Sequence, residues 1–357
     1  MSPTMRIAQV SPLFESVPPR LYGGTERVVS FLTEALVRDG HSVTLFASAD
    51  SVTSARLVPS CERALRLDGC EHEQEVVHQR QLHQLFSRCG EFDVLHFHTD
   101  RIHFRPARRQ GVPHVTTLHG RLDLPELVPL MREVQGSPLV SISDAQRRPL
   151  AWASWIATVP HGLPRDLFHF HAGPGRYLAF LGRISPEKGC DRAIQIAVRA
   201  GMPLRIAAKI DAADKEYYEQ VIRPMMRHPL VEYVGEIDER EKDAFLGNAM
   251  ALLFPIDWPE PFGLVMIEAM ACATPVLAFD RGSVREVIDD GVTGRIVTSV
   301  EQALRVLPEV IALDRRGCRQ RFEQRFTADR MAEDYVRVYR NAVEASEARP
   351  RREASNG

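Results

Sequence analysis

One order of elements occurs twice in this sequence, and it limits the fold more than any other feature. In the first half, an apolar run at 7–10 is followed by a loop rich in proline and glycine, and then by residues 26–38, whose apolar side chains recur with helical periodicity. Asp39 and Gly40 end this helix, and residues 42–47 resemble a second buried strand. Right-handed crossovers make such strands parallel neighbours in one sheet.

The second half repeats this order. Residues 177–181 form an apolar run, GRISPEKG is a loop, 190–200 has helical periodicity, and 204–208 is the next apolar run. At 357 residues, the chain is long enough for two domains of ordinary size. The sequence therefore predicts an α/β fold of two doubly wound, Rossmann-like domains that face each other across a cleft. Ligands are expected at the carboxyl ends of the strands.

The other elements and the boundaries follow from the same periodicity. Further strands are expected at 94–97, 115–118, 139–141, 231–234, 251–254 and 275–278. Proline and glycine accumulate in IATVPHGLPRDLFHFHAGPGRY, so we expect an N-terminal domain over 1–165 and a C-terminal domain over 166–327. A helix over 328–345 is expected to pack back toward the first domain, and 346–357 to be a disordered tail.

Composition excludes several classes of protein. The net charge of -2 gives no reason to expect nucleic-acid binding. The N-terminus lacks the features of a signal peptide, and no apolar run approaches the roughly 20 residues needed to cross a bilayer. The six cysteines include no C-x-x-C pair, which argues against a zinc site or a disulfide framework. We expect a cytoplasmic protein without a metal ion.

The stretch WPEPFGLVMIEAMACATPVLA carries two carboxylates next to a predicted helix that extends from Phe262. The backbone N–H groups of Phe262, Gly263 and Leu264 at its start would form an anion site. Glu260 lies just before the helix and Glu268 lies inside it, and each carboxylate can accept hydrogen bonds from vicinal hydroxyl groups. The plainer alternatives are a helix-capping role for Glu260 and a solvated helix face for Glu268.

The loop GRISPEKG contains two cations at the first strand-to-helix turn of the second half. This position holds phosphates in many α/β domains, so Arg183 and Lys188 would neutralise a diphosphate. The alternative is that both residues are surface charges on a loop.

Together these two stretches resemble the retaining glycosyltransferases of family 4 (glycosyl transferases group 1), which have the GT-B fold. The words YGGTERVV, TLHG, VPHGL and DDGVTGRIV agree with this resemblance, which extends from Met5 to about Ala342. YGGTERVV looks like a subset that includes tailoring enzymes of oligosaccharide natural products. One departure is His161 in VPHGL, where many relatives have asparagine; we expect little effect on the chemistry.

The resemblance implies how the donor is held in the second half. Glu268 should bind the ribose hydroxyl groups of a nucleotide. Glu260, with the backbone N–H groups of Phe262, Gly263 and Leu264, should hold the donor sugar.

The resemblance also implies how the phosphates and the reacting carbon are stabilised. Arg183 and Lys188 should contact the diphosphate, and the turn at Gly23 and Gly24 should approach the donor phosphates. His119 should lie beside the donor sugar and help stabilise positive charge at its anomeric carbon. The expected catalytic residues are therefore His119, Glu260, Arg183 and Lys188.

The expected reaction moves a hexosyl group from a nucleoside-diphosphate sugar to a hydroxyl acceptor with retention and without a metal ion. The acceptor attacks from the face that the leaving group departs, and the departing phosphate takes its proton. UDP-hexose is favoured over GDP-mannose as the nucleotide-sugar co-substrate. The acceptor stays open between a saccharide, a lipid-linked sugar and a small metabolite, as expected for an enzyme of carbohydrate biosynthesis.

Three other functions remain as alternatives. An oxidoreductase using NAD(P) would need G-x-G-x-x-G after a strand, which neither glycine-containing loop supplies. A sugar-nucleotide 2-epimerase of the same fold would share donor binding but would need acid and base groups around the sugar, for which only Glu260 and His119 are obvious. A non-catalytic sugar-nucleotide-binding protein would have lost the charged residues that this chain retains.

Two further features are given structural interpretations. The pairs His96/His98 and His169/His171 resemble metal ligands, but no carboxylate or cysteine follows at ligand spacing, so we expect ordinary packing. The segment TDRIHFRPARRQG gathers basic side chains around Phe104 and could touch a membrane surface. We favour a solvated basic face, so peripheral membrane contact is not the expected role. Its arginines are Arg101, Arg105, Arg108 and Arg109.

Overall fold

A computed structural model describes residues 3–69, 74–99 and 101–348. Contacts within the chain divide it into two compact units. The first comprises the chain up to Ile142, Leu150–Val159 and the chain from Asp329 onward. The second comprises Ser143–Pro149 and Pro160–Ala328.

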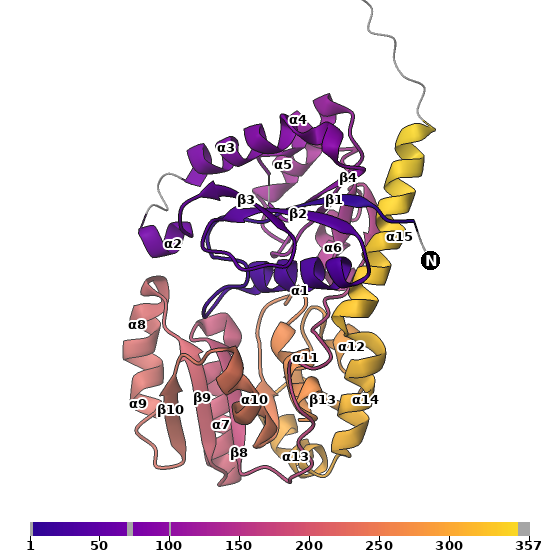
Figure 1. Ribbon diagram of the computed structural model, residues 1–357. Helices are drawn as coiled ribbons and strands as arrows, with labels where there is room; N and C mark the ends of the chain where they lie inside the picture. Colours follow the sequence, from indigo (N-terminus) through magenta and orange to yellow (C-terminus); the bar gives the residue numbers. More distant parts are fainter. Residues whose placement is uncertain (1–2, 70–73, 100, 349–357) are drawn as a thin grey trace, which may run out of the picture. The chain divides into compact units, whose positions relative to one another are not determined.

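The first unit is built on a parallel sheet of seven strands in the order β3-β2-β1-β4-β5-β6-β7. Its strands are β1 (Arg6–Val10), β2 (Ser42–Ser48), β3 (Arg56–Cys61), β4 (Val94–Phe97), β5 (His114–Thr117), β6 (Leu139–Ser141) and β7 (Trp155–Thr158). Its helices are α1 (Gly24–Arg38), α2 (Leu65–Asp68), α3 (Gln74–Phe86), α4 (Phe104–Gln110), α5 (Leu127–Glu133) and α15 (Ala328–Glu347). Figure 1 shows α1 on one face of this sheet and α3 and α4 on the other. Because helices cover both faces, β1 and β4 are buried along nearly their whole length.

The second unit has a parallel sheet of six strands in the order β10-β9-β8-β11-β12-β13. Its strands are β8 (Tyr177–Arg183), β9 (Leu204–Lys209), β10 (Val231–Gly235), β11 (Ala249–Phe254), β12 (Val276–Phe279) and β13 (Gly294–Val297). Its helices are α6 (Asp144–Arg147), α7 (Cys190–Ala200), α8 (Lys215–Tyr217), α9 (Arg223–Met225), α10 (Glu239–Gly247), α11 (Leu264–Ala271), α12 (Val284–Val287), α13 (Val300–Ile311) and α14 (Arg315–Arg325). Apolar side chains of α7 and α13 form the core with those of β8, β9, β11 and β12.

Each sheet has one point at which the strand order reverses. In the first unit it lies between β1 and β4, and in the second between β8 and β11. The connections leave such a pair of strands in opposite directions, which opens a crevice at their carboxyl ends where α/β proteins bind ligands. The prediction of two Rossmann-like domains is confirmed, and the topology points to two places where ligands would bind.

The expected element list was incomplete at the sheet edges. Sequence periodicity missed β3, β7 and β13, each of which is the outermost strand at one edge of its sheet. Their burial pattern is mixed, since an edge strand has a neighbour on only one side, so the apolar run is weaker. β7 overlaps the start of the segment that sequence reasoning assigned to the interdomain junction.

The division into units also differs from the expected boundary after residue 165. The second unit begins at Pro160 and contains Ser143–Pro149. Hydrogen bonds explain why Ser143–Pro149 belongs to the second unit. Ser143 Oγ donates to the carbonyl of Pro261 (2.6 Å), and the N–H of Asp144 donates to Glu286 (2.7 Å). These bonds attach α6 to the second unit although it follows a strand of the first.

The last helix contacts the first unit, to which it belongs from Asp329. It extends to Glu347, so the first two residues of the expected tail are helical. Residues 349–357 lie outside the described part of the chain. The largest fully buried side chains of α15 are Tyr335 and Tyr339, and both form hydrogen bonds to residues of the first sheet.

The basic segment differs in one respect from the expected surface. Phe104 is fully buried in the core of the first unit, so it does not offer an apolar contact to a membrane. Arg105 instead forms an ion pair with Glu133 at 2.5 Å. Over the described residues, none of the helices combines the length and apolar character needed to cross a membrane.

Candidate functional site

Two loops of the second unit meet where the strand order of its sheet reverses. The loop after β8 contains a 3-10 turn, Pro186–Lys188, and ends at Gly189, which adopts a φ of 72°. A Cβ atom on Gly189 would lie 2.1 Å from the carbonyl oxygen of Pro255, which follows β11. Only glycine allows this approach. It holds Lys188 beside the segment that leads into α11.

Glu260 forms the centre of this segment. Lys188 Nζ donates to Glu260 Oε2 at 2.6 Å, and Trp258 Nε1 donates to the same oxygen at 2.9 Å. The Lys188 ammonium also lies 4.7 Å from the centroid of the Trp258 ring. Glu260 is 8% exposed, and the N-cap of α11 is Gly263. The helix-capping alternative for Glu260 is therefore wrong, and the carboxylate belongs to a buried charge pair.

The start of α11 differs slightly from expectation. The helix begins at Leu264 rather than Phe262, because the residue between them, Gly263, has a left-handed conformation (φ 81°) that is incompatible with a right-handed helix. Phe262 is buried, and its carbonyl accepts a hydrogen bond from Ser283 Oγ at 2.9 Å. The first-turn N–H groups of a helix lack partners within the helix, so this start retains the properties of an anion site.

Glu268 is also buried and paired, which contradicts the solvated-face alternative. It is 3% exposed, and Lys242 Nζ of α10 donates to its Oε1 at 2.8 Å. Lys242 lies 3.8 Å from Glu239 as well. Sequence reasoning missed Lys242, since nothing in its surroundings distinguishes it from a surface lysine.

Arg183 lies among three carboxylates that sequence reasoning also missed. Its guanidinium contacts Glu187 at 2.6 Å, Asp214 at 3.3 Å and Asp211 at 3.5 Å. Burial on its own would raise the pKa of Glu187, but hydrogen bonds and the charge of Arg183 hold its pKa below the usual value. Three carboxylates thus compensate the positive charge of Arg183, whereas Lys188 is paired with Glu260.

The remaining predicted site residues belong to the first unit. Gly23 and Gly24 lie at the start of α1, and a Cβ atom on Gly23 would lie 2.7 Å from the side chain of Pro19. His119 follows β5, is partly buried, and its Nε2 lies 2.9 Å from Nδ1 of His98. Burial lowers the pKa of His119 to about 3, so the ring is neutral near pH 7.

His161 belongs to the second unit and is buried against the segment before α11. Its ring lies 4.9 Å from the ring of Phe262. It therefore supports the backbone next to Gly263.

Two family profiles match the chain. The one described as "Glycosyltransferase Family 4" matches residues 22–159, and the one described as "Glycosyl transferases group 1" matches residues 168–323. The chain belongs to the family 4, group 1 glycosyltransferases. The expected membership is confirmed, and each profile covers most of one sheet.

A curated relative and two solved structures of other proteins are similar to this glycosyltransferase. The phosphatidyl-myo-inositol mannosyltransferase of Mycolicibacterium smegmatis is 27% identical over 82% of this chain and 81% of its own length. AviGT4, a glycosyltransferase involved in avilamycin A biosynthesis, has a TM-score of 0.73 at 23% identity over 95% and 98% of the two chains. HepE of Anabaena in complex with UDP and glucose has a TM-score of 0.69 at 16% identity over 94% and 100%. The structural likenesses confirm the GT-B fold.

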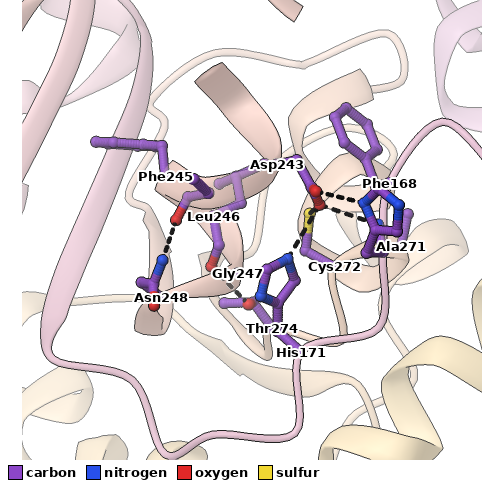
Figure 2. Close-up of polar contacts among 12 residues, drawn as sticks. Phe168, His171, Asp243, Phe245, Leu246, Gly247, Asn248, Ala271, Cys272 and Thr274 are labelled. Carbon is purple, nitrogen blue, oxygen red and sulfur yellow. Dashed lines mark hydrogen bonds and ion pairs between the residues drawn. The ribbon is translucent and has the colours of Figure 1, made fainter. Parts of the chain in front are cut away.

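The glycosyltransferase also contains a polar cluster that sequence reasoning did not foresee. Asp243 of α10 accepts hydrogen bonds from His169 Nδ1 (2.6 Å) and His171 Nε2 (3.1 Å), and Cys272 Sγ lies 3.8 Å away. Figure 2 shows His171 and Cys272 directed toward the Asp243 carboxylate. A carboxylate and a cysteine do therefore join the histidine pair, although they are distant in sequence. Among the described residues, no group of three or more ligand-type side chains could hold a metal ion.

Asp243→Asn is expected to lower the free energy of unfolding at pH 7 by about 1 kcal/mol. Burial alone would raise the pKa of Asp243, but the hydrogen bonds from His169 and His171 outweigh it and hold the pKa below its usual value. The stabilisation is therefore present above the ordinary aspartate pKa of about 4 and is lost as the pH falls through the lowered value. Urea unfolding of both proteins at pH 7, 5 and 3.5 measures this. A stability difference that stays constant down to pH 3.5 would contradict the assignment.

Proposed function

We propose that this glycosyltransferase transfers a hexosyl group from a nucleoside-diphosphate sugar to a hydroxyl acceptor with retention of anomeric configuration and without a metal ion. The observation that supports this most is the pair of buried carboxylate–lysine contacts beside α11, Glu260 with Lys188 and Glu268 with Lys242. A buried charge pair is costly to maintain for stability alone. Both carboxylates lie in or just before α11, which follows β11, one of the two strands between which the strand order reverses and α/β proteins bind ligands.

The two carboxylates have different partners, and this suggests different roles. Glu260 shares one oxygen with Lys188 and Trp258, so its other oxygen can accept hydrogen bonds from sugar hydroxyl groups. Glu268 is more deeply buried and is held by one lysine. We assign it to the vicinal hydroxyl groups of the ribose.

The leaving group is stabilised by positive charge. As the bond between the anomeric carbon and the phosphate oxygen breaks, negative charge grows on the nucleoside diphosphate. Lys188 and the N–H groups at the start of α11 stabilise that charge. The guanidinium of Arg183, which contacts Glu187, adds further positive charge. These groups supply positive charge from the protein itself, so we propose that no metal ion is required.

The acceptor oxygen forms its bond to the anomeric carbon on the face from which the phosphate leaves. Its proton passes to the departing phosphate oxygen, so atoms and charges balance without a covalent enzyme intermediate. The neutral ring of His119 does not repel the positive charge that develops on the sugar. A protonated ring at this position would raise the barrier.

UDP-hexose is the donor we propose, with GDP-mannose as the competing donor. HepE, whose similar structure contains UDP and glucose, supports UDP-hexose. GDP-mannose is tested as well, because a mannosyltransferase is among the relatives. The acceptor is a hydroxyl group of a saccharide, a lipid-linked sugar or a small metabolite.

Calorimetric titration with UDP, GDP, ADP and NAD, with and without EDTA, tests the donor site. One nucleoside diphosphate is expected to bind selectively and independently of EDTA. Glu268→Ala should weaken this binding about 100-fold, or about 2.7 kcal/mol. Glu301→Ala is the matched control, because Glu301 is an exposed glutamate of α13 whose ion pair with Arg199 (3.1 Å) is open to solvent and contributes little.

The results separate the alternatives. Binding of NAD alone would overturn the proposal, and dependence of nucleotide binding on a divalent cation would overturn the metal-free mechanism. Once a donor is identified, the anomeric proton coupling in the NMR spectrum of the product reports retention or inversion.

A further inference from the structure

A continuous chain of hydrogen bonds runs through the first unit from His119 to the last helix. It connects side chains of β1, β4, β5 and α15, and of the residues just after β4 and β5, which are far apart in sequence. The contacts are His119 Nε2 to His98 Nδ1 (2.9 Å), His98 Nε2 to Gln9 Oε1 (2.7 Å), Gln9 Nε2 to Tyr339 Oη (3.0 Å), Tyr339 Oη to His96 Nδ1 (2.7 Å), His96 Nε2 to Thr117 Oγ1 (2.8 Å) and Thr117 Oγ1 to Tyr335 Oη (2.8 Å).

The side chains that form this chain of hydrogen bonds are buried, apart from His119 at its end. Gln9, His96 and Tyr339 have no exposed surface, and His98 is 3% exposed. Polar groups at such depth are costly unless they are hydrogen-bonded, so a broken link would leave a buried donor or acceptor without compensation. Networks of this kind hold their members in one arrangement.

The amide of Gln9 gives the chain a direction. Its Nε2 can only donate, and donates to Tyr339, so its Oε1 is the atom that accepts from His98 Nε2. A neutral His98 then has its proton on Nε2 and accepts at Nδ1. His119 must therefore donate from Nε2 to His98, which makes Nδ1 the unprotonated nitrogen of His119.

The other half of the chain is consistent with the same direction. The Tyr339 hydroxyl accepts from Gln9 and donates to His96 Nδ1. His96 then carries its proton on Nε2 and donates it to Thr117. With neutral imidazole rings, one assignment of protons satisfies every contact of the chain.

We propose that Gln9 and Tyr339 are positioning residues for His119, which fix its Nε2–H tautomer and ring orientation through His98. This inference rests on the proposed function only in taking His119 to act on the donor sugar. A fixed tautomer presents Nδ1 of His119 as a hydrogen-bond acceptor for a sugar hydroxyl group. Groups that orient metal-bound histidines change affinity or activity by about 10- to 100-fold when they are lost, and we expect an effect of about tenfold here.

Long-range ¹H–¹⁵N NMR of protein labelled at histidine nitrogens tests the tautomer directly. The signals of His119 are assigned by their absence from His119→Gln. In the wild-type protein we expect a proton on Nε2 and none on Nδ1 of His119 at neutral pH. A proton on Nδ1 instead would overturn the proposal, as would a protonated His98 that donates to His119.

Gln9→Glu provides the sharper variant. A carboxylate accepts from both neighbours, so it favours a protonated His98, which then donates from Nδ1 to His119 and moves the His119 proton to Nδ1. An unchanged His119 tautomer in a folded Gln9→Glu protein would overturn the proposal. Tyr339→Phe removes only one hydroxyl group and serves if Gln9→Glu does not fold.

Kinetics complete the test. Tyr339→Phe should lower kcat about tenfold and raise the KM for the donor by no more than about threefold, because the contacts proposed for the nucleotide do not involve His119. Tyr177→Phe is the matched control, since Tyr177 is a buried tyrosine of the second unit whose hydroxyl donates to the carbonyl of Phe245 at 2.8 Å. A wild-type protein with the expected tautomer but no transferase activity would refute the proposed function and leave the positioning role of Gln9 and Tyr339 intact. Normal kinetics in Tyr339→Phe would refute that positioning role and leave the proposed function intact.

Discussion

Without the Glu260 carboxylate, kcat/KM for glycosyl transfer is expected to fall about 100-fold. Glu260→Ala removes the partner of Lys188 and of Trp258, both of which donate to the same carboxylate oxygen. The ammonium group of Lys188 would then lie in a largely buried position without its counter-charge, a loss that typically costs about 3 kcal/mol. Initial-rate measurements with the donor identified by calorimetry give kcat and KM separately.

The conservative variant distinguishes the two possible roles of Glu260. Glu260→Gln keeps a hydrogen-bonding group of the same size, so we expect most of kcat to remain while the KM for the donor rises about tenfold. Glu301→Ala should leave both constants unchanged. Detection of a covalent sugar adduct on Glu260 by mass spectrometry would show that it is the nucleophile and not a positioning group.

Arg315→Ala is expected to lower the free energy of unfolding by about 3 kcal/mol. The guanidinium of Arg315 donates to the carbonyl groups of His171 (2.8 Å), Gly247 (2.9 Å) and Ala249 (2.9 Å) and to Thr274 Oγ1 (2.7 Å). It thus joins the segment before β8 to the end of α10, to β11 and to the turn after α11; three of its four partners are labelled in Figure 2. Alanine would leave several partly buried oxygens without donors.

Urea or thermal unfolding measures the loss, with Arg316→Ala as the matched control. Arg316 is the next residue of α14 and is exposed, so its removal should change stability by less than about 0.5 kcal/mol. Arg315→Lys should fall between the two, because an ammonium group cannot reach four acceptors at once. A loss below about 1 kcal/mol for Arg315→Ala would show that the four contacts do not hold this part of the unit together.

Sequence periodicity predicted the central strands of both sheets, because these strands are apolar along their length, and the helices that follow β1, β8 and β11. It missed β3, β7 and β13 near the edges, where the environment is only partly apolar. The positions of Glu260 and Glu268 relative to α11 were also correct, since the proline and glycine around them determine local backbone geometry. Their burial was not visible in the sequence.

The sequence by itself determined the repeated α/β order, the glycosyltransferase motifs and the residues that carry charge. Only the tertiary structure decided the partner of each charged or polar group. Lys188 and Glu260 are 72 residues apart, Lys242 and Glu268 are 26 apart, and Gln9 and Tyr339 are 330 apart. Periodicity depends only on residues that are close in sequence, so it predicts which face of a helix or strand is buried. A buried polar group must be hydrogen-bonded or paired, and its partner is a residue that the packing of distant elements places next to it.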